Sequence, residues 1–355
     1  MTRSAMTAPP NTPGIRAVAA SGIAAFIAAH GAAVDRVFAR AEVAAEVFAQ
    51  PQQRLPLVAY CDVFEHAARQ TGLGSFGLHF GLARAAEALG PVGEVALRAP
   101  TLGAALVALC RYFPALQDHS SLTLQRAGAV ARLEYQIRDG RILLRRQDAE
   151  LTIGVLIALI RGVLGPTWAP ASVEFEHLRP AGRGDIETLL GASVTFSSPV
   201  NGMIFPAAVL AVPMPAPDPG RAGALAAQLA AEIAAAPPND LVGEVCQQIR
   251  AALAGGDAAR AWVARRMGTS EASLYRALRR RGVEFSDLVR GLRQDLALTY
   301  LRESDLPLTE IALLLGYSEL SAFSRAFRTW TGVAPAVYRR AAACAPELAR
   351  TGQNY

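Results

Sequence analysis

The chain has 355 residues, which is too long for one ordinary domain core and leads us to expect two domains. Hydrophobic residues make up 52% of it and charged residues 18%, so the composition excludes a disordered or fibrous protein. Its 35 basic residues, all arginine, and 30 acidic residues give a formal net charge of +5, too weak by itself to establish a polyanionic partner.

Cysteine spacing and apolar runs indicate the compartment. The four cysteines are widely scattered without a Cys-x-x-Cys pair, which favours reduced thiols and no zinc site. The strongest apolar run, 151–160, ends at Arg161 and is too short to cross a bilayer. The alanine-rich stretch 18–33 lacks a clear cleavage site for secretion. We therefore expect a cytoplasmic protein with no membrane partner, no metal and no other cofactor.

The first part of the chain has a mainly helical pattern. Residues 1–16 are proline-rich at the start and predict a loose tail, and apolar residues at helical spacing follow over 17–90. A further helix is expected from Leu102, with Thr101 as its N-cap and Pro114 as its end.

The hydrophobic period then changes from helical to alternating. Apolar residues alternate with polar ones over 122–137 on both sides of Ala127-Gly128, which predicts a β-hairpin. A helix over 149–164 separates this hairpin from two short strand patterns near Val173 and Val194. Residues 17–212 therefore predict one mixed α+β domain.

A proline-rich segment marks the expected domain boundary. Four prolines within 213–219 cannot continue a helix or a central strand, so 213–240 predicts a linker with one short helix. Leu225, Leu229 and Ile233 form the apolar face of that helix and are a candidate dimer contact. Residues 241–340 are helical by pattern, and we expect 341–355 to form a C-terminal tail.

An internal repeat is the most informative feature of the C-terminal region. Val263-Ala264 and Met267-Gly268 recur as Ile311-Ala312 and Leu315-Gly316, and the segment 274–279 recurs as 323–328. Each copy has a helix, a glycine turn and a second helix, which is the pattern of a helix-turn-helix.

The outward faces of the second helices suggest DNA contacts. Residues 240–340 hold fifteen arginines and eleven acids, so most of the net charge lies there. Arg276 and the run 279–281 form the densest basic cluster. The expected DNA-binding residues, with Arg279 and Arg328 on phosphates and most of the others at base edges, are Ala272, Tyr275, Arg276, Arg279, Arg280, Ser321, Ser324, Arg325 and Arg328.

Other motifs carry less weight. Gly72-Leu-Gly-Ser-Phe-Gly77 matches a dinucleotide loop, but a helical pattern precedes it where a strand is required. No nucleophile–base pair or paired carboxylates stand out, so we do not expect an enzyme. Candidate ligand-binding residues in the N-terminal domain, on weaker grounds, are Arg111, Tyr112, His119 and His177.

Residues 241–340 resemble the DNA-binding domain of the AraC/XylS family of bacterial transcription regulators. The resemblance is carried by Ile311-Ala-Leu-Leu-Leu-Gly316-Tyr, Phe323-Ser-Arg325 and Gly332-Val-Ala-Pro335, with Leu274-Tyr-Arg276 in the first copy. It implies two helix-turn-helix units joined by a linker helix around 293–301.

Residues 17–212 resemble, more loosely, the effector domain of the branch with ornithine- and virulence-type regulators. Phe76-Gly-Leu78, Gly90-Pro-Val-Gly93 and Pro100-Thr-Leu102 are among the matching pieces. The resemblance implies a homodimer that senses an unknown small molecule, binds double-stranded DNA and contacts RNA polymerase. The alternative is a small-molecule-binding protein whose C-terminal helical repeat, with solvated arginines, binds a protein partner.

Overall fold

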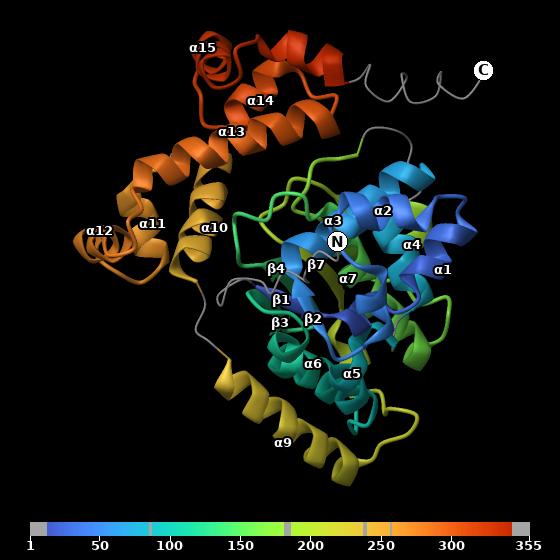
Figure 1. The fold of residues 1–355 in the computed structure, drawn as a ribbon. Helices are drawn as coiled ribbons and strands as arrows, with labels where there is room; N and C mark the ends of the chain where they lie inside the picture. The colour runs from blue at the N-terminus through green and yellow to red at the C-terminus, as the bar shows by residue number, and fades with distance from the viewer. Residues whose placement is uncertain (1–12, 85–86, 181–185, 237–239, 256–257, 343–355) are drawn as a thin grey trace, which may run out of the picture. The chain divides into compact units, whose positions relative to one another are not determined.

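The computed structural model describes residues 13–84, 87–180, 186–236, 240–255 and 258–342 (Figure 1). Contacts divide the chain into two compact units. The first takes in the described residues of 1–137, 144–178 and 183–238, and the second those of 138–143, 179–182 and 239–355. The expected fold class, an α+β domain followed by an all-α domain with two helix-turn-helix units, is confirmed.

A five-stranded sheet forms one part of the first unit. Its strand order is β3-β4-β7-β5-β6, and only the β5–β6 pair is parallel. The strands are β3 Ser120–Ala127, β4 Val130–Ile137, β5 Ser172–Glu174, β6 Ser193–Thr195 and β7 Asn201–Pro206. The predicted hairpin is confirmed, with Gly128 at φ +60° in its turn. Strand β7 was missed by the sequence pattern, although it pairs with both β4 and β5.

Helices make up most of the rest of the first unit (Figure 1). They are α1 Ile23–Ala29, α2 Val34–Arg40, α3 Leu57–Thr71, α4 Phe76–Ala83, α5 Gly90–Leu97, α6 Leu102–Leu116, α7 Arg146–Leu164, α8 Ile186–Leu190 and α9 Pro219–Ala235. Helices α6 and α7 pack against the sheet. Helix α7 confirms the expected helix over 149–164 and is buried over most of its length. Thr101 caps α6 by accepting a hydrogen bond from the amide of Ala104, as predicted. The expectation that α6 ends at Pro114 is wrong, because the helix continues through this proline to Leu116.

Glycines allow α4 and α7 to touch along their backbones. A Cβ on Gly77 would lie 2.0 Å from the carbonyl oxygen of Gln147, and one on Gly81 would lie 2.3 Å from that of Leu151. Gly72 ends α3 at φ +70°. Two glycines of the G-x-G-x-x-G match therefore serve a helix end and a helix contact, and a helix precedes the motif as expected.

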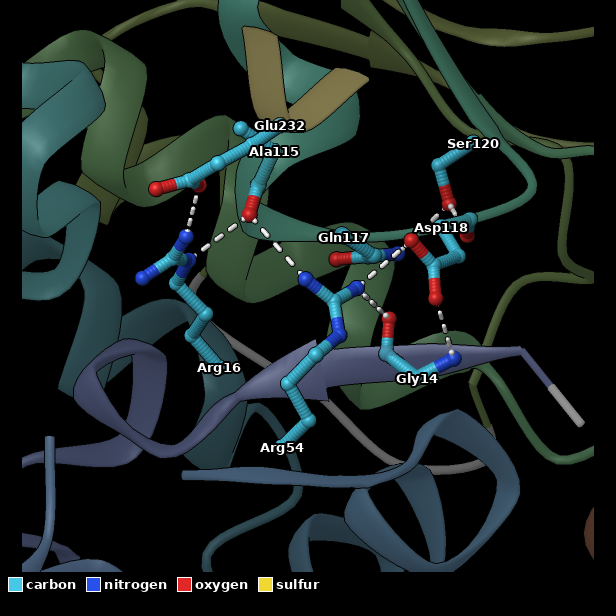
Figure 2. A network of polar contacts seen from close by, with 8 residues as sticks. All are labelled: Gly14, Arg16, Arg54, Ala115, Gln117, Asp118, Ser120 and Glu232. Atoms are coloured by element: carbon cyan, nitrogen blue, oxygen red, sulfur yellow. Dashed lines mark hydrogen bonds and ion pairs between the residues drawn. The ribbon is translucent and has the colours of Figure 1, made fainter. Parts of the chain in front are cut away.

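Two short strands and α9 join the first unit through a polar network (Figure 2). Strand β1 Gly14–Arg16 pairs with β2 Arg54–Pro56, although we expected 14–16 in the tail and a helical pattern around 54–56. Arg16 and Arg54 both donate to the carbonyl oxygen of Ala115 at the end of α6. Arg16 also forms an ion pair with Glu232 of α9.

Helix α9 differs from the expected linker helix in its packing. It contacts α5 and α6, and Leu229 is buried within the same unit. The apolar face centred on Leu229 is thus covered by the chain's own residues. This packing removes the reason for assigning Leu229 to a dimer contact.

Six named helices build the second unit around one hydrophobic core. They are α10 Leu241–Ala254, α11 Arg260–Arg266, α12 Glu271–Arg279, α13 Phe285–Glu303, α14 Leu308–Leu314 and α15 Leu320–Thr331. Figure 1 shows α11 and α12 at one end of α13 and α14 and α15 at the other.

The second unit also includes residues 138–143, which the sequence places between β4 and α7. The amide of Gly140 donates to the carbonyl oxygen of Gly243 at 3.0 Å. A Cβ on Gly140 would lie 2.2 Å from the backbone of Cys246. Arg141 forms an ion pair with Asp240, the N-cap of α10. Residues 138–143 therefore pack against α10 as part of the second unit.

Candidate nucleic-acid interface

The first helix-turn-helix consists of α11, a turn at Gly268 and α12. Gly268 has φ +66°, which a residue without a Cβ adopts at little cost. Ser270 caps α12 by accepting a hydrogen bond from the amide of Ser273 at 3.1 Å. Leu274 and Leu278 lie one turn apart and are buried, so the opposite side of α12 faces away from the core.

The second helix-turn-helix repeats this geometry. Gly316 takes φ +74° between α14 and α15, and Phe323 and Phe327 are buried in the places of the two leucines. The amide of Thr269 donates to the carbonyl oxygen of Ala264 at 2.9 Å, and that of Tyr317 donates to Ala312 over the same distance. The repeat in the sequence is thus also a repeat in backbone hydrogen bonding.

Helix α13 joins the two copies. Its buried residues, Leu292, Leu296, Ala297 and Leu301, belong to the same hydrophobic cluster as the buried residues of both copies. Arg293 of α13 donates to the carbonyl oxygen of Leu315 at 3.0 Å, at the turn of the second copy. The separation of the two outward-facing helices is therefore set by one shared core.

The structure leaves the predicted DNA-binding side chains accessible. The exposed residues among them are Ala272, Tyr275, Arg276, Arg279, Arg280, Ser321, Arg325 and Arg328. Ser324 is half-buried. Each set lies on one side of its helix, as groove reading requires.

Ion pairs and ring contacts organise the arginines around α12. The guanidinium carbons of Arg260 and Arg279 lie 5.4 and 6.0 Å from the centre of the Tyr275 ring. Arg260 is paired with Glu271, and Arg279 with Glu284. The sequence reasoning missed Arg260, because this residue lies on α11 and only the folded turn brings it to the face of α12.

Three of the ligand candidates, Arg111, Tyr112 and His177, have different surroundings. Arg111 is exposed and lies over the ring of Tyr112 at 5.4 Å. His177 stacks on Phe175, and its Nδ1 lies 2.9 Å from the carbonyl oxygen of Leu178. Burial lowers the pKa of His177 to about 3, so its ring is neutral.

A small cavity lies among the helices of the first unit. It is lined mainly by apolar residues, with Tyr60, Gln117 and Thr152 as its polar members. None of the four candidates lines it. Its small size is typical of space for a water molecule rather than for a ligand that fills a preformed site.

Buried acids lie near the start of α7. Tyr135 donates to Asp148 at 2.6 Å and accepts from Gln117 at 2.6 Å. Burial raises the pKa of Asp148 to about 7, against the opposing effects of Tyr135 and Arg145. Burial likewise raises the pKa of Glu150 to about 7. The first unit thus holds two carboxyl groups that change charge near neutral pH.

The described residues contain no group of three or more histidines, cysteines and acids that could hold a metal ion. Among the same residues, no helix combines the length and apolar character needed to cross a membrane.

Two family models match the chain. One, described as the arabinose-binding domain of the AraC transcription regulator, N-terminal part, matches residues 31–214. The chain belongs to the AraC family of transcription regulators. A second model, described as a helix-turn-helix domain, matches residues 263–341 and covers both copies of the repeat. This AraC-type regulator therefore combines an N-terminal domain of the family's ligand-binding type with a C-terminal DNA-binding domain.

Bacterial regulators are similar over most of the chain. The ornithine utilization regulator of Pseudomonas aeruginosa is 28% identical over 326 residues, covering 89% of this chain and 93% of that protein. The transcriptional regulator VirS of Mycobacterium tuberculosis is 28% identical over 291 residues, covering 80% and 84%. The crystal structure of the regulator CdpR from Pseudomonas aeruginosa is 21% identical, with a TM-score of 0.40, covering 86% of this chain and 96% of that one.

Proposed function

We propose that this AraC-type regulator reads an asymmetric DNA site through α12 and α15, under the control of a small molecule sensed by its first unit. The observation that supports this most strongly is the pair of outward-facing helices on one shared core. Such a core suits two recognition helices that enter successive major grooves on one side of the duplex, about 34 Å apart.

Different residues of each helix have different tasks in this proposal. On α12, Ala272, Tyr275 and Arg276 approach base edges, while Arg279 and Arg280 hold phosphates. On α15, the base-reading residues are Ser321, Ser324 and Arg325, and the phosphate-binding residue is Arg328. Because the two sets differ in chemistry, one chain reads an asymmetric sequence.

The effector and the partners are further parts of the proposal. Similarity to a regulator named for ornithine utilization supports a small metabolite as effector, without fixing which one. A homodimer would read two such sites, and contact with RNA polymerase would turn binding into control of transcription. We place the protein in the cytoplasm, at the nucleoid.

Selection of the full-length protein on random-sequence DNA, followed by binding at several salt concentrations, tests the proposal. We expect an enriched motif with two segments about one helical turn apart and an affinity that falls steeply with salt. An absence of salt-dependent DNA binding would sink the proposal and favour the alternative, a helical repeat that binds a protein partner.

A further inference from the structure

Arg260 occupies a special place in the first helix-turn-helix. It is the first residue of α11, and its side chain is 38% exposed. Its Nε and Nη2 atoms donate to the same oxygen of Glu271, at 2.9 and 2.7 Å, at the start of α12. The pair therefore joins the beginnings of the two helices that flank the turn.

The ring of Tyr275 joins this pair to the other end of α12. Tyr275 is 41% exposed, and the guanidinium groups of both Arg260 and Arg279 lie within cation–π range of its ring. Arg279 is held in addition by an ion pair with Glu284. One aromatic ring thus positions two arginines that come from different helices.

The chemistry of these arginines suits DNA phosphates. A guanidinium group offers the same donors to a phosphate as to a carboxylate, so a phosphate oxygen can take the place of Glu271 or Glu284. Exposed ion pairs are weak, so this exchange costs little. In helix-turn-helix proteins the first helix crosses the DNA backbone. Arg260 is the first residue of that helix, α11, so its side chain would lie near the phosphates.

We propose that Arg260 and Arg279 form a phosphate clamp that the Tyr275 ring positions and that Glu271 and Glu284 occupy in the DNA-free protein. This inference rests on the proposed function and refines it in two ways. It adds Arg260 to the DNA-binding residues, and it makes Tyr275 a positioning residue rather than a reader of bases.

The test measures DNA affinity of the full-length protein across salt, on the selected sequence and on a scrambled one. Arg260→Ala should reduce the slope of log affinity against log salt by about 0.9, because one phosphate contact is lost. The affinity for the selected sequence and the affinity for the scrambled one should fall to the same extent. Arg260→Gln serves as a second variant, and thermal unfolding checks the fold of each.

A matched control removes an arginine of similar kind. Arg290 of α13 is 66% exposed and ion-paired with Asp287, so Arg290→Ala deletes an equivalent charge outside the clamp. It should change the slope much less than Arg260→Ala. An equal change would show a general charge effect and overturn the clamp.

Two substitutions distinguish the role of the Tyr275 ring from that of its hydroxyl group. Tyr275→Phe keeps the ring and should match the wild type in slope and in sequence preference, whereas Tyr275→Leu should reduce the slope as Arg260→Ala does. Glu271→Gln should raise affinity on both sequences, because it removes a competing acid.

Two further outcomes overturn the inference while leaving the proposed function intact. One is an unchanged salt slope in folded Arg260→Ala and Arg260→Gln proteins. The other is a relaxed sequence preference in Tyr275→Phe, which would show that the hydroxyl reads a base. Failure of the wild type to bind DNA would instead sink the proposed function itself.

Discussion

Gly77 of α4 lies so close to Gln147 of α7 that a Cβ on the glycine would stand 2.0 Å from the glutamine's carbonyl oxygen. The Gln147 side chain reinforces this approach, because its Oε1 accepts from the amide of Gly77 at 2.7 Å and its Nε2 donates to the carbonyl oxygen of Gly74 at 2.8 Å. Backbone contact and side-chain hydrogen bonds thus hold the two helices at one distance.

Gly77→Ala should therefore lower the free energy of unfolding by about 1–3 kcal/mol, because the added methyl group forces the helices apart. Gly74→Ala is the matched control, since a Cβ there meets no atom within 4 Å. Chemical denaturation of both variants measures the difference. Equal stability of the two variants would contradict the close-packed interpretation of Gly77.

Stability of the first unit should depend on pH through Asp148. The fold raises the pKa of this carboxyl from 3.8 to about 7 by burial, so the folded state binds more protons than the unfolded state between these values. The free energy of unfolding contributed by Asp148 therefore falls as pH rises from about 4 to 7. Urea denaturation across this range checks the trend.

Asp148→Asn isolates this contribution, because Glu150 acts in the same direction and His177, with a pKa lowered to about 3, acts in the opposite one. The asparagine keeps an acceptor for the Tyr135 hydroxyl. We expect the variant to gain stability relative to the wild type as pH rises from 4 to 8. A constant difference across this range would contradict the raised pKa.

Arg276 is expected to read a base. Its side chain is exposed in the middle of α12 and donates to the Ser273 hydroxyl at 3.2 Å. Arg276→Ala should weaken binding to the preferred site by about 1–3 kcal/mol and relax preference at one base pair. Competition binding on single-base variants of the site measures this, and equal weakening on every sequence would reassign Arg276 to phosphate.

Phe327 should dominate the stability of the second helix-turn-helix. It is fully buried, and its ring centre lies 5.8 Å from that of Phe323 and 5.6 Å from that of Tyr338. Phe327→Ala should cost about 3–5 kcal/mol of unfolding free energy, and Phe327→Leu much less, because leucine fills most of the space. Equal free energies of unfolding for the two variants, measured by chemical denaturation, would contradict this prediction.

Local patterns predicted the elements that local residues determine. The alternation around Gly128 and the repeat around Gly268 and Gly316 each contain their own turn signal, and the structure has the hairpin and both helix-turn-helix units there. The exposed face of α12 followed from the spacing of its buried leucines. Its base and phosphate contacts stay predictions.

Features that depend on distant partners could not be predicted in this way. Strand β7 lies between β4 and β5 in the sheet and pairs with both of them, although both are distant in the sequence. Helix α9 joins the first unit through Leu229 and the ion pair of Glu232 with Arg16, which is more than two hundred positions away. Arg260 escaped notice for the same reason, since its contact with Tyr275 exists only in the folded turn.

Residues 138–143 belong to the second unit although they lie between β4 and α7 in the sequence. The second unit is therefore not one continuous stretch of the chain. Leu143 packs against the core of the second unit, and Arg250 donates to the carbonyl oxygen of Ile142 at 3.4 Å. A chimera joined at the proline-rich boundary would transplant α10–α15 but leave behind residues 138–143, whose backbone packs against α10. Exchange of sensing domains between such regulators must therefore carry the β4–α7 connection along, or redesign the surface of α10 that it covers.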